Sequence, residues 1–173
     1  VDLRLEPERT LPSVRAALDG LRSLPNTSDG PYGLIGFSFG APQVVVAATH
    51  RDVSDQLAGV IGFGGYCDIE SMVRFQMTGH FTWGDTQHHL RPDPYGRWIM
   101  GGNHLTSIPD YENAQDVSDA LWRLAVEAGE RRILAWDPSY DTLKEQLREQ
   151  VSRDRREIFD LFAPPSDREP DEA

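Results

Sequence analysis

Two short apolar runs with a helical segment between them constrain the fold of this chain more than any other feature. Residues 32–37 and 59–66 are nearly continuous apolar runs bounded by turn residues, a pattern typical of strands buried on both faces of a parallel sheet. Between them, residues 41–50 carry valines and alanines at helical spacing, with Pro42 in a first-turn position. This order predicts a β-α-β unit and therefore the α/β fold class.

The rest of the chain is predicted to be mainly helical. An amphipathic helix precedes the first strand, and apolar residues at helical spacing predict helices at 69–77, 95–105, 114–130 and from 138 to 162. Residues 79–94 show no hydrophobic periodicity, which predicts a loop. Residues 131–136 could form a strand within this mainly helical part. We expect a sheet-containing part at 1–68, a helical part at 69–162 and a disordered, Pro-rich acidic tail at 163–173.

One motif carries chemical specificity: Gly36-Phe37-Ser38-Phe39-Gly40 fits Gly-x-Ser-x-Gly. It lies where the first predicted strand ends and the helix begins, the setting in which a strained turn lifts a serine hydroxyl clear of a sheet. The residues two before and two after that serine must be small because strand and helix pass close together, and Gly36 and Gly40 meet this need. The alternative is a glycine-rich turn around an inert serine.

Residues 32–68, with this motif, resemble the α/β-hydrolase family. The resemblance implies a parallel sheet with a helical cap-like second half, in which Ser38 is the nucleophile that attacks an ester, thioester or amide carbonyl. It also implies that the backbone N–H of Phe39 is one donor of the oxyanion hole, and that a histidine oriented by an acid takes the serine proton.

The chain also departs from the family pattern. The family order is serine, acid and then a late histidine, yet the last histidine is His104, and only 37 residues precede Ser38. We therefore expect a partial α/β-hydrolase-like sheet, lacking the early strands and the late Asp/His part of a longer protein. Open strand edges should make the isolated chain poorly soluble, oligomeric or partly ordered, and its oligomeric state stays open.

Two aspartates have two interpretations each. Asp68 follows the second predicted strand, where some α/β-hydrolases place their acid, and it can equally cap the next helix by accepting an N–H from Glu70 or Ser71. Asp137, before Pro138, has the same two interpretations. Capping is the favoured one for both residues.

Histidines and large apolar residues gather in the presumed cap. One of its histidines could be a substitute general base, and no set of them has the spacing of a metal site; the histidines are His80, His88, His89 and His104. The large apolar side chains could line an acyl pocket or pack as a helical core. They are Phe75, Met77, Phe81, Trp83, Tyr95, Trp98, Ile99 and Met100.

Composition narrows the function classes further. A net charge of −11, from 17 Lys+Arg against 28 Asp+Glu, disfavours a nucleic-acid partner. The single cysteine, Cys67, cannot form an intramolecular disulfide, so a reducing cytoplasm is expected. No apolar stretch reaches the roughly 20 residues of a membrane span, and nothing in the sequence implies a cofactor or a metal.

The expected function is hydrolysis of a small carboxylic ester or thioester through an acyl-Ser38 intermediate, impaired or inactive in this chain because a triad histidine is missing. A non-catalytic relative that keeps a binding or interaction surface is an alternative. An acyltransferase, which passes the acyl group to an alcohol or amine, is another.

Overall fold

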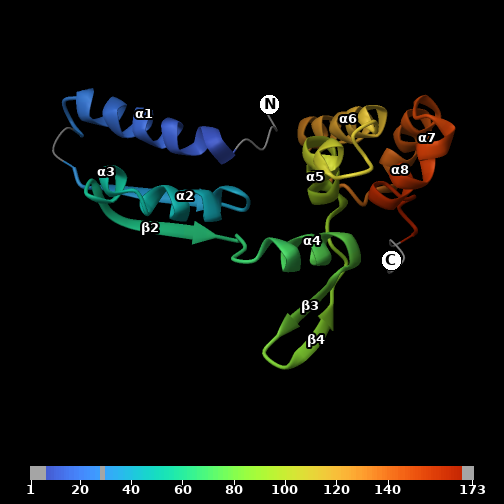
Figure 1. Cartoon of the computed structure of the whole chain (residues 1–173), viewed down its shortest axis with the longest axis horizontal. Coiled ribbons are helices and arrows are strands. Elements are labelled where there is room, and N and C mark those ends of the chain that lie inside the picture. Colours follow the sequence, from blue (N-terminus) through green and yellow to red (C-terminus); the bar gives the residue numbers. More distant parts are fainter. Residues whose placement is uncertain (1–6, 28–29, 169–173) are drawn as a thin grey trace. The chain divides into compact units, whose positions relative to one another are not determined.

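The computed structural model describes residues 7–27 and 30–168, which form two compact units of a mixed α/β chain (Figure 1). The strand unit is Leu5–Ile69, and the helical unit runs from Glu70 onward. Each unit has its own apolar core, and each is described by itself below.

The strand unit contains the predicted β-α-β arrangement. Its elements are the 3-10 turn η1 (Pro7–Arg9), α1 (Thr10–Ser23), β1 (Tyr32–Phe37), α2 (Gly40–Ala48), α3 (Arg51–Ser54) and β2 (Leu57–Phe63). The two strands are parallel, with partners running from Gly33↔Gly59 to Phe37↔Phe63. The α/β class and the first predicted strand are confirmed, whereas the second strand begins two residues earlier than predicted and ends at Phe63 instead of residue 66.

Helix α2 covers one face of the sheet and α1 packs on α2 from the same side, as Figure 1 shows for α1, α2 and β2. Apolar side chains at helical spacing form the core between them: Leu18, Ala41, Val44, Ala47 and Val53. A bidentate ion pair joins α1 to α3, with Nε and Nη2 of Arg15 at 2.6 and 3.1 Å from the Asp52 carboxylate.

The prediction that both faces of the strands are buried is wrong. The side chains on the face away from α2 are largely exposed: Ile35 (54%), Phe37 (66%), Ile61 (59%) and Phe63 (69%). The reason is that none of the described elements of the strand unit lies on that face, because α2 packs on the other face and α1 packs on α2. An apolar run shows that a strand can be buried, whereas its actual burial depends on what packs against it.

The helical unit has more elements, most of them packed around buried aromatic and leucine side chains such as Trp98, Leu121, Leu124, Tyr140 and Phe159. They are α4 (Ile69–Thr78), β3 (His80–Trp83), β4 (Thr86–His89), α5 (Pro94–His104), η2 (Leu105–Ser107), α6 (Gln115–Arg131), η3 (Pro138–Tyr140), α7 (Asp141–Gln150), η4 (Arg153–Arg155) and α8 (Arg156–Phe162). Residues 132–136 contain no strand.

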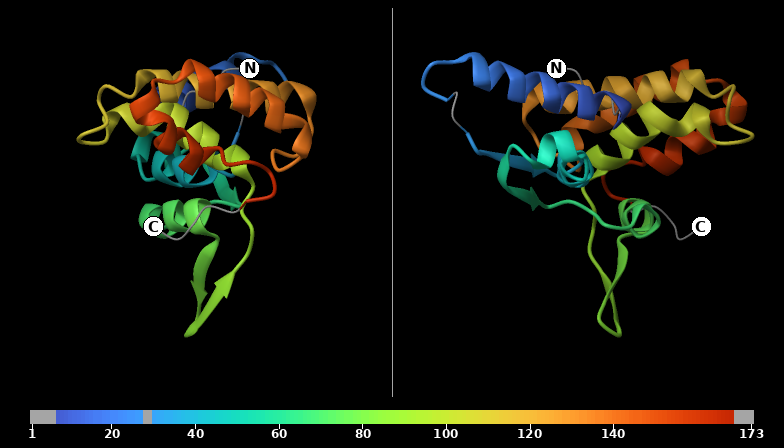
Figure 2. Two further views of the ribbon diagram at one scale, coloured as in Figure 1. Left: turned by 90° about the vertical axis from the view of Figure 1, so that its right-hand side faces the viewer. Right: turned by 60° about the vertical axis from the view of Figure 1, so that its left-hand side comes forward.

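The predicted loop at 79–94 is wrong in its central part, where β3 and β4 form an antiparallel hairpin that extends away from the helices of this unit (Figure 2). The strands pair from His80↔His89 to Trp83↔Thr86, so the connection has two residues, Gly84 and Asp85. Gly84 has φ +59°, a conformation that tight hairpin turns require and that glycine adopts at little cost.

Two predictions near the C-terminal end also need correction. The helix expected from 138 to 162 is interrupted, because Val151 adopts an extended conformation after α7. Residues 163–168, expected to be disordered, are held in place: Lys144 Nζ donates to the Pro164 carbonyl oxygen at 2.9 Å, and Ser166 donates twice to the Asp141 carboxylate. The rest of the expected tail, 169–173, lies outside the described residues.

Candidate functional site

Ser38 lies in a tight turn between the end of β1 and the start of α2, as the sequence motif predicts. Its backbone has φ +50°, in the left-handed region that serine rarely adopts. Two hydrogen bonds hold the turn: the Ser38 N–H donates to the Phe63 carbonyl at 2.8 Å, and the Ser38 carbonyl accepts the Ala41 N–H at 3.0 Å. The side chain is exposed at the carboxyl end of β1.

The close approach of β1 and α2 restricts position 36 to glycine, but it places no such restriction on position 40. A Cβ on Gly36 would overlap the Gly40 carbonyl oxygen and lie 2.6 Å from Val44 Cγ2, whereas a Cβ on Gly40 would have nothing within 4 Å. A second glycine, Gly65, lies equally close to the start of α2, with its added Cβ 2.5 Å from the Ala41 Cβ. Gly65 was not singled out from the sequence.

Phe39 directly precedes α2, and its ring packs edge to face on Tyr66, with 5.9 Å between the ring centroids. The N–H groups at the start of a helix have no acceptor within that helix, and the helix dipole favours negative charge there. Phe39 thus stands at the helix end where backbone N–H groups lack intrahelical acceptors.

Within the described residues of the strand unit, no histidine lies beside Ser38. Among the described residues, the Ser38 hydroxyl has no hydrogen-bond partner. The only histidine of the strand unit, His50, follows the opposite end of α2, and this nine-residue helix is about 13 Å long at 1.5 Å per residue. The other four histidines belong to the helical unit.

Asp68 is exposed and lies in the turn between β2 and α4, directly before the first residue of α4. That is the position from which a side chain caps a helix, and it also follows the carboxyl end of β2. Both interpretations of Asp68 therefore stay open. Asp137 has a defined role, because its side chain accepts the Ser139 N–H at 2.8 Å and caps η3.

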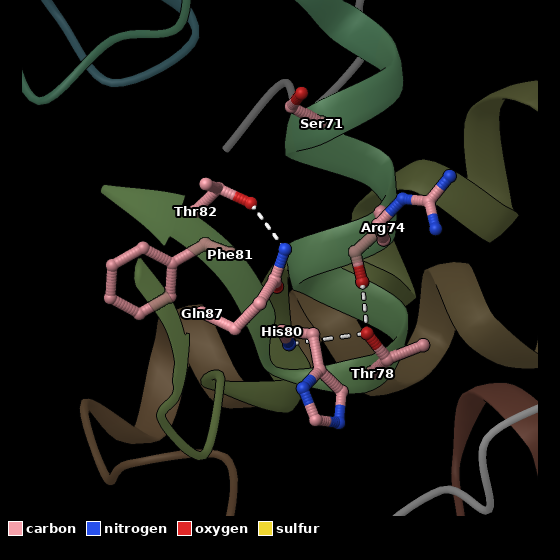
Figure 3. A pocket seen from close by; sticks show the side chains of 7 residues that line it. All are labelled: Ser71, Arg74, Thr78, His80, Phe81, Thr82 and Gln87. Carbon is pink, nitrogen blue, oxygen red and sulfur yellow. Dashed lines mark hydrogen bonds between the residues drawn. The ribbon is translucent and has the colours of Figure 1, made fainter. Parts of the chain in front are cut away.

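A pocket of about 530 Å³ lies in the helical unit between α4 and the hairpin (Figure 3). Its lining side chains are Ser71, Arg74 and Thr78 of α4, His80, Phe81 and Thr82 of β3, and Gln87 of β4. The Gln87 amide donates to Thr82 Oγ1 at 2.9 Å, and Thr78 Oγ1 donates to the Arg74 carbonyl at 2.8 Å. Several polar groups of the pocket are thus already engaged with one another.

The pocket does not assemble a nucleophile with a base. Ser71 lies at one end of it and His80 at the other, as Figure 3 shows. The His80 ring lies against His89, with 4.7 Å between centroids, and the His88 ring stacks on Phe81. The Arg74 guanidinium pairs with Glu70 at 3.4 Å.

The large apolar residues divide between core and surface. Trp98, Ile99 and Met100 are buried among the helices of their unit, whereas Trp83 is 78% exposed at the end of the hairpin. The cluster is therefore not the lining of one acyl pocket, and only Phe81 contributes to the pocket described above.

The pocket was not foreseen, because it depends on the hairpin. The signal for that hairpin was present in the Gly84-Asp85 pair between short segments rich in threonine and aromatic residues. A two-residue connection of this kind would have placed residues 80–83 beside residues 86–89.

Comparisons with protein-family models, curated proteins and solved structures found no match. Within residues 7–27 and 30–168, no three His, Cys, Asp or Glu side chains come together as metal ligands do. No helix in that part of the chain is long and apolar enough to cross a membrane.

Proposed function

We propose that Ser38 is the nucleophile of an acyl-transfer site of the α/β-hydrolase type, which cleaves small carboxylic esters or thioesters through an acyl-serine intermediate. The observation that carries the proposal is the left-handed backbone of Ser38 between a parallel strand and the helix that follows it. A non-glycine residue in this region is uncommon, and such residues cluster at functional sites.

The chemistry follows from the position of the hydroxyl. Ser38 Oγ attacks the carbonyl carbon and forms the new C–O bond, while its proton passes to a general base. The Phe39 N–H stabilises the oxyanion, and collapse of the tetrahedral intermediate expels the alcohol or thiol, which takes a proton. Water then attacks the acyl-serine, releases the carboxylic acid and restores the hydroxyl.

The step that this chain supports least is proton removal, because the Ser38 hydroxyl has no partner among the described residues. Loss of a base from a serine triad lowers kcat by several powers of ten. We therefore expect slow turnover, with the reactivity of Ser38 most visible toward strongly electrophilic reagents.

The same observation favours a second candidate, a non-catalytic protein that retains the turn and uses this surface for binding. A fluorophosphonate probe, which forms a covalent bond to nucleophilic serines, separates the two. The proposal predicts labelling that is lost in Ser38→Ala and kept in Ser54→Ala, since Ser54 is an exposed serine of the same unit that lies on α3. A folded chain that does not react, or equal labelling of both variants, would instead support the binding protein.

An acyltransferase shares the first half of the reaction and differs in the acceptor. If Ser38 is acylated, adding a small alcohol or amine distinguishes the two enzymes. A hydrolase releases the free acid, whereas a transferase passes the acyl group to the added acceptor.

A further inference from the structure

The bare face of the sheet in the strand unit is a compact apolar patch of four side chains: Ile35 and Phe37 of β1, and Ile61 and Phe63 of β2. Alternate residues of a strand share a face, so each strand contributes two neighbours. The register places Ile35 beside Ile61 and Phe37 beside Phe63, and the two phenyl rings meet edge to face at 6.2 Å. All four side chains are more than half exposed.

Nothing in the two strands selects a charged partner. Neither Tyr32–Phe37 nor Leu57–Phe63 contains a charged residue, so the patch presents only apolar side chains. Parallel sheets in folded proteins are normally covered on both faces, and an exposed apolar patch of this kind marks a site of association.

The patch is also nearly symmetric. The residues of the patch that pair across the sheet are identical, Ile35 with Ile61 and Phe37 with Phe63. If the two strands were exchanged, each isoleucine would therefore take the place of the other isoleucine, and each phenylalanine that of the other phenylalanine. A twofold axis parallel to the strands, midway between two such faces, would therefore stack Phe37 of one copy on Phe63 of the other, and Ile35 on Ile61. A closed dimer needs a self-complementary surface of this type.

The apolar area of the patch comes close to what such an interface needs. An aromatic side chain presents about 150–250 Å², so the four partly exposed side chains together offer on the order of 400–500 Å² per copy. Two copies would then bury about 800–1,000 Å² of apolar surface before any rim contacts, close to the roughly 1,000 Å² expected of a specific interface.

We propose that this face binds a second copy of the same chain, and that the two sheets stack face to face, with α2 of each copy on the opposite face of its own sheet. The inference does not depend on the chemistry of Ser38. That residue lies beyond Phe37 at the carboxyl end of β1, whereas the stacking uses the side chains within the strands.

Sedimentation velocity over a dilution series of the full chain tests this proposal. The wild-type chain is expected to sediment as a dimer that dissociates on dilution. Ile61→Lys is expected to raise the dissociation constant at least about tenfold, because one lysine per copy would be buried against apolar side chains. Raising the salt concentration should strengthen the wild-type dimer, because each copy carries a net charge of −11.

Val46→Lys is the matched control. Val46 is 61% exposed on α2, almost the same as Ile61, and it lies outside the patch, so the same change of charge there should leave the dimer intact. Ile35→Lys should repeat the effect of Ile61→Lys, and unchanged far-UV circular dichroism would show that both variants fold.

Four results would overturn the proposal: a monomeric wild-type chain, a dimer that survives both patch variants, equal weakening by Val46→Lys, or assemblies that grow without limit as concentration rises. A monomeric wild type would leave the patch to a different partner, and unlimited growth would exclude a closed twofold arrangement.

Discussion

Gly36 lies so close to the carbonyl oxygen of Gly40 that no side chain fits between strand β1 and helix α2 at this point. A methyl group on Gly36 would overlap that oxygen and would also lie 2.6 Å from Val44 Cγ2. The oxygen belongs to the backbone, so relief of the overlap would have to move the helix itself. The close approach therefore fixes the turn that holds Ser38.

Gly36→Ala is expected to open this turn. The added methyl should destabilise the strand unit by about 1–3 kcal/mol, as overpacking commonly does, and should reduce fluorophosphonate labelling of Ser38. Hydrogen–deuterium exchange of peptides from β1 and β2 measures the first effect. Gly33→Ala is the control on the same strand, because a Cβ there would meet nothing within 4 Å. Equal behaviour of the two variants would argue against a sterically fixed turn.

Replacement of two glycines of the helical unit by alanine should change the free energy of unfolding in opposite directions. At Gly101 in α5, an added Cβ would lie 2.5 Å from Leu121 Cδ1 and 3.0 Å from Phe162 Cδ1, and Leu121 is fully buried, so Gly101→Ala should cost about 1–3 kcal/mol. At Gly129 in α6 an added Cβ would have its nearest neighbour, the Tyr95 hydroxyl, 3.7 Å away. Gly129→Ala should therefore stabilise the helical unit by about 0.5–1 kcal/mol.

Tryptophan fluorescence during urea unfolding measures the stability of both glycine variants. All four tryptophans lie in the helical unit: Trp83, Trp98, Trp122 and Trp136. Destabilisation by Gly129→Ala, or no change with Gly101→Ala, would contradict the packing described for α5 and α6.

The Asp116–Arg155 pair should make the helical unit sensitive to acid. Burial alone would raise the pKa of Asp116, but hydrogen bonds from Arg155 and from the Ser152 N–H lower this pKa well below its ordinary 3.8. A carboxyl with a depressed pKa stabilises the folded state above the unfolded pKa, and this contribution is lost as pH falls below 3.8. We expect Asp116→Asn to cost about 1–3 kcal/mol near pH 7 and progressively less in acid.

Urea titrations at several pH values, followed by tryptophan fluorescence, measure this effect. Asp154→Asn is the control, because Asp154 contacts the same arginine at 3.4 Å from a side chain that is 74% exposed, and its removal should change little. A pH-independent difference between the wild type and Asp116→Asn would show that the carboxylate charge is not responsible.

Lys144 should anchor residues 163–168. Its side chain is 5% exposed, and its amine donates to the Pro164 carbonyl at 2.9 Å and to Asp141 at 3.1 Å. Lys144→Ala removes both bonds, so faster amide exchange is expected at Ser166, whose N–H donates to Asp141. Glu145→Ala changes an exposed neighbour and should leave this exchange unaltered. Equal exchange in the two variants would mean that other contacts hold the segment.

The β-α-β order was predictable because it depends on local features, namely apolar runs, their lengths and the glycines between them. The position of Ser38 followed from the same features. The exposure of Phe37 and Phe63 was not predictable from those runs, because it depends on whether another element packs against the outer face of the sheet.

The pocket was missed for a different reason. It requires residues of α4 and of both hairpin strands to meet, and the hairpin depends on one glycine with positive φ, Gly84, within a segment of mixed composition. Lys144 shows the same limit. Charged residues surround it in the sequence, yet its side chain is buried and its amine donates to the carbonyl of Pro164, 20 positions farther along the chain.

Acylation by an activated ester tests the central claim most directly, with the adduct located by tryptic peptide mass spectrometry. Cleavage after Arg22 and Arg51 releases residues 23–51 as one peptide, and fragmentation within it separates Ser38 from Ser23 and Ser28. The account predicts an acyl group on Ser38 that forms faster than on any other serine and is absent from Ser38→Ala. Acyl groups spread evenly over exposed serines, or none on Ser38 in a folded chain, would contradict it.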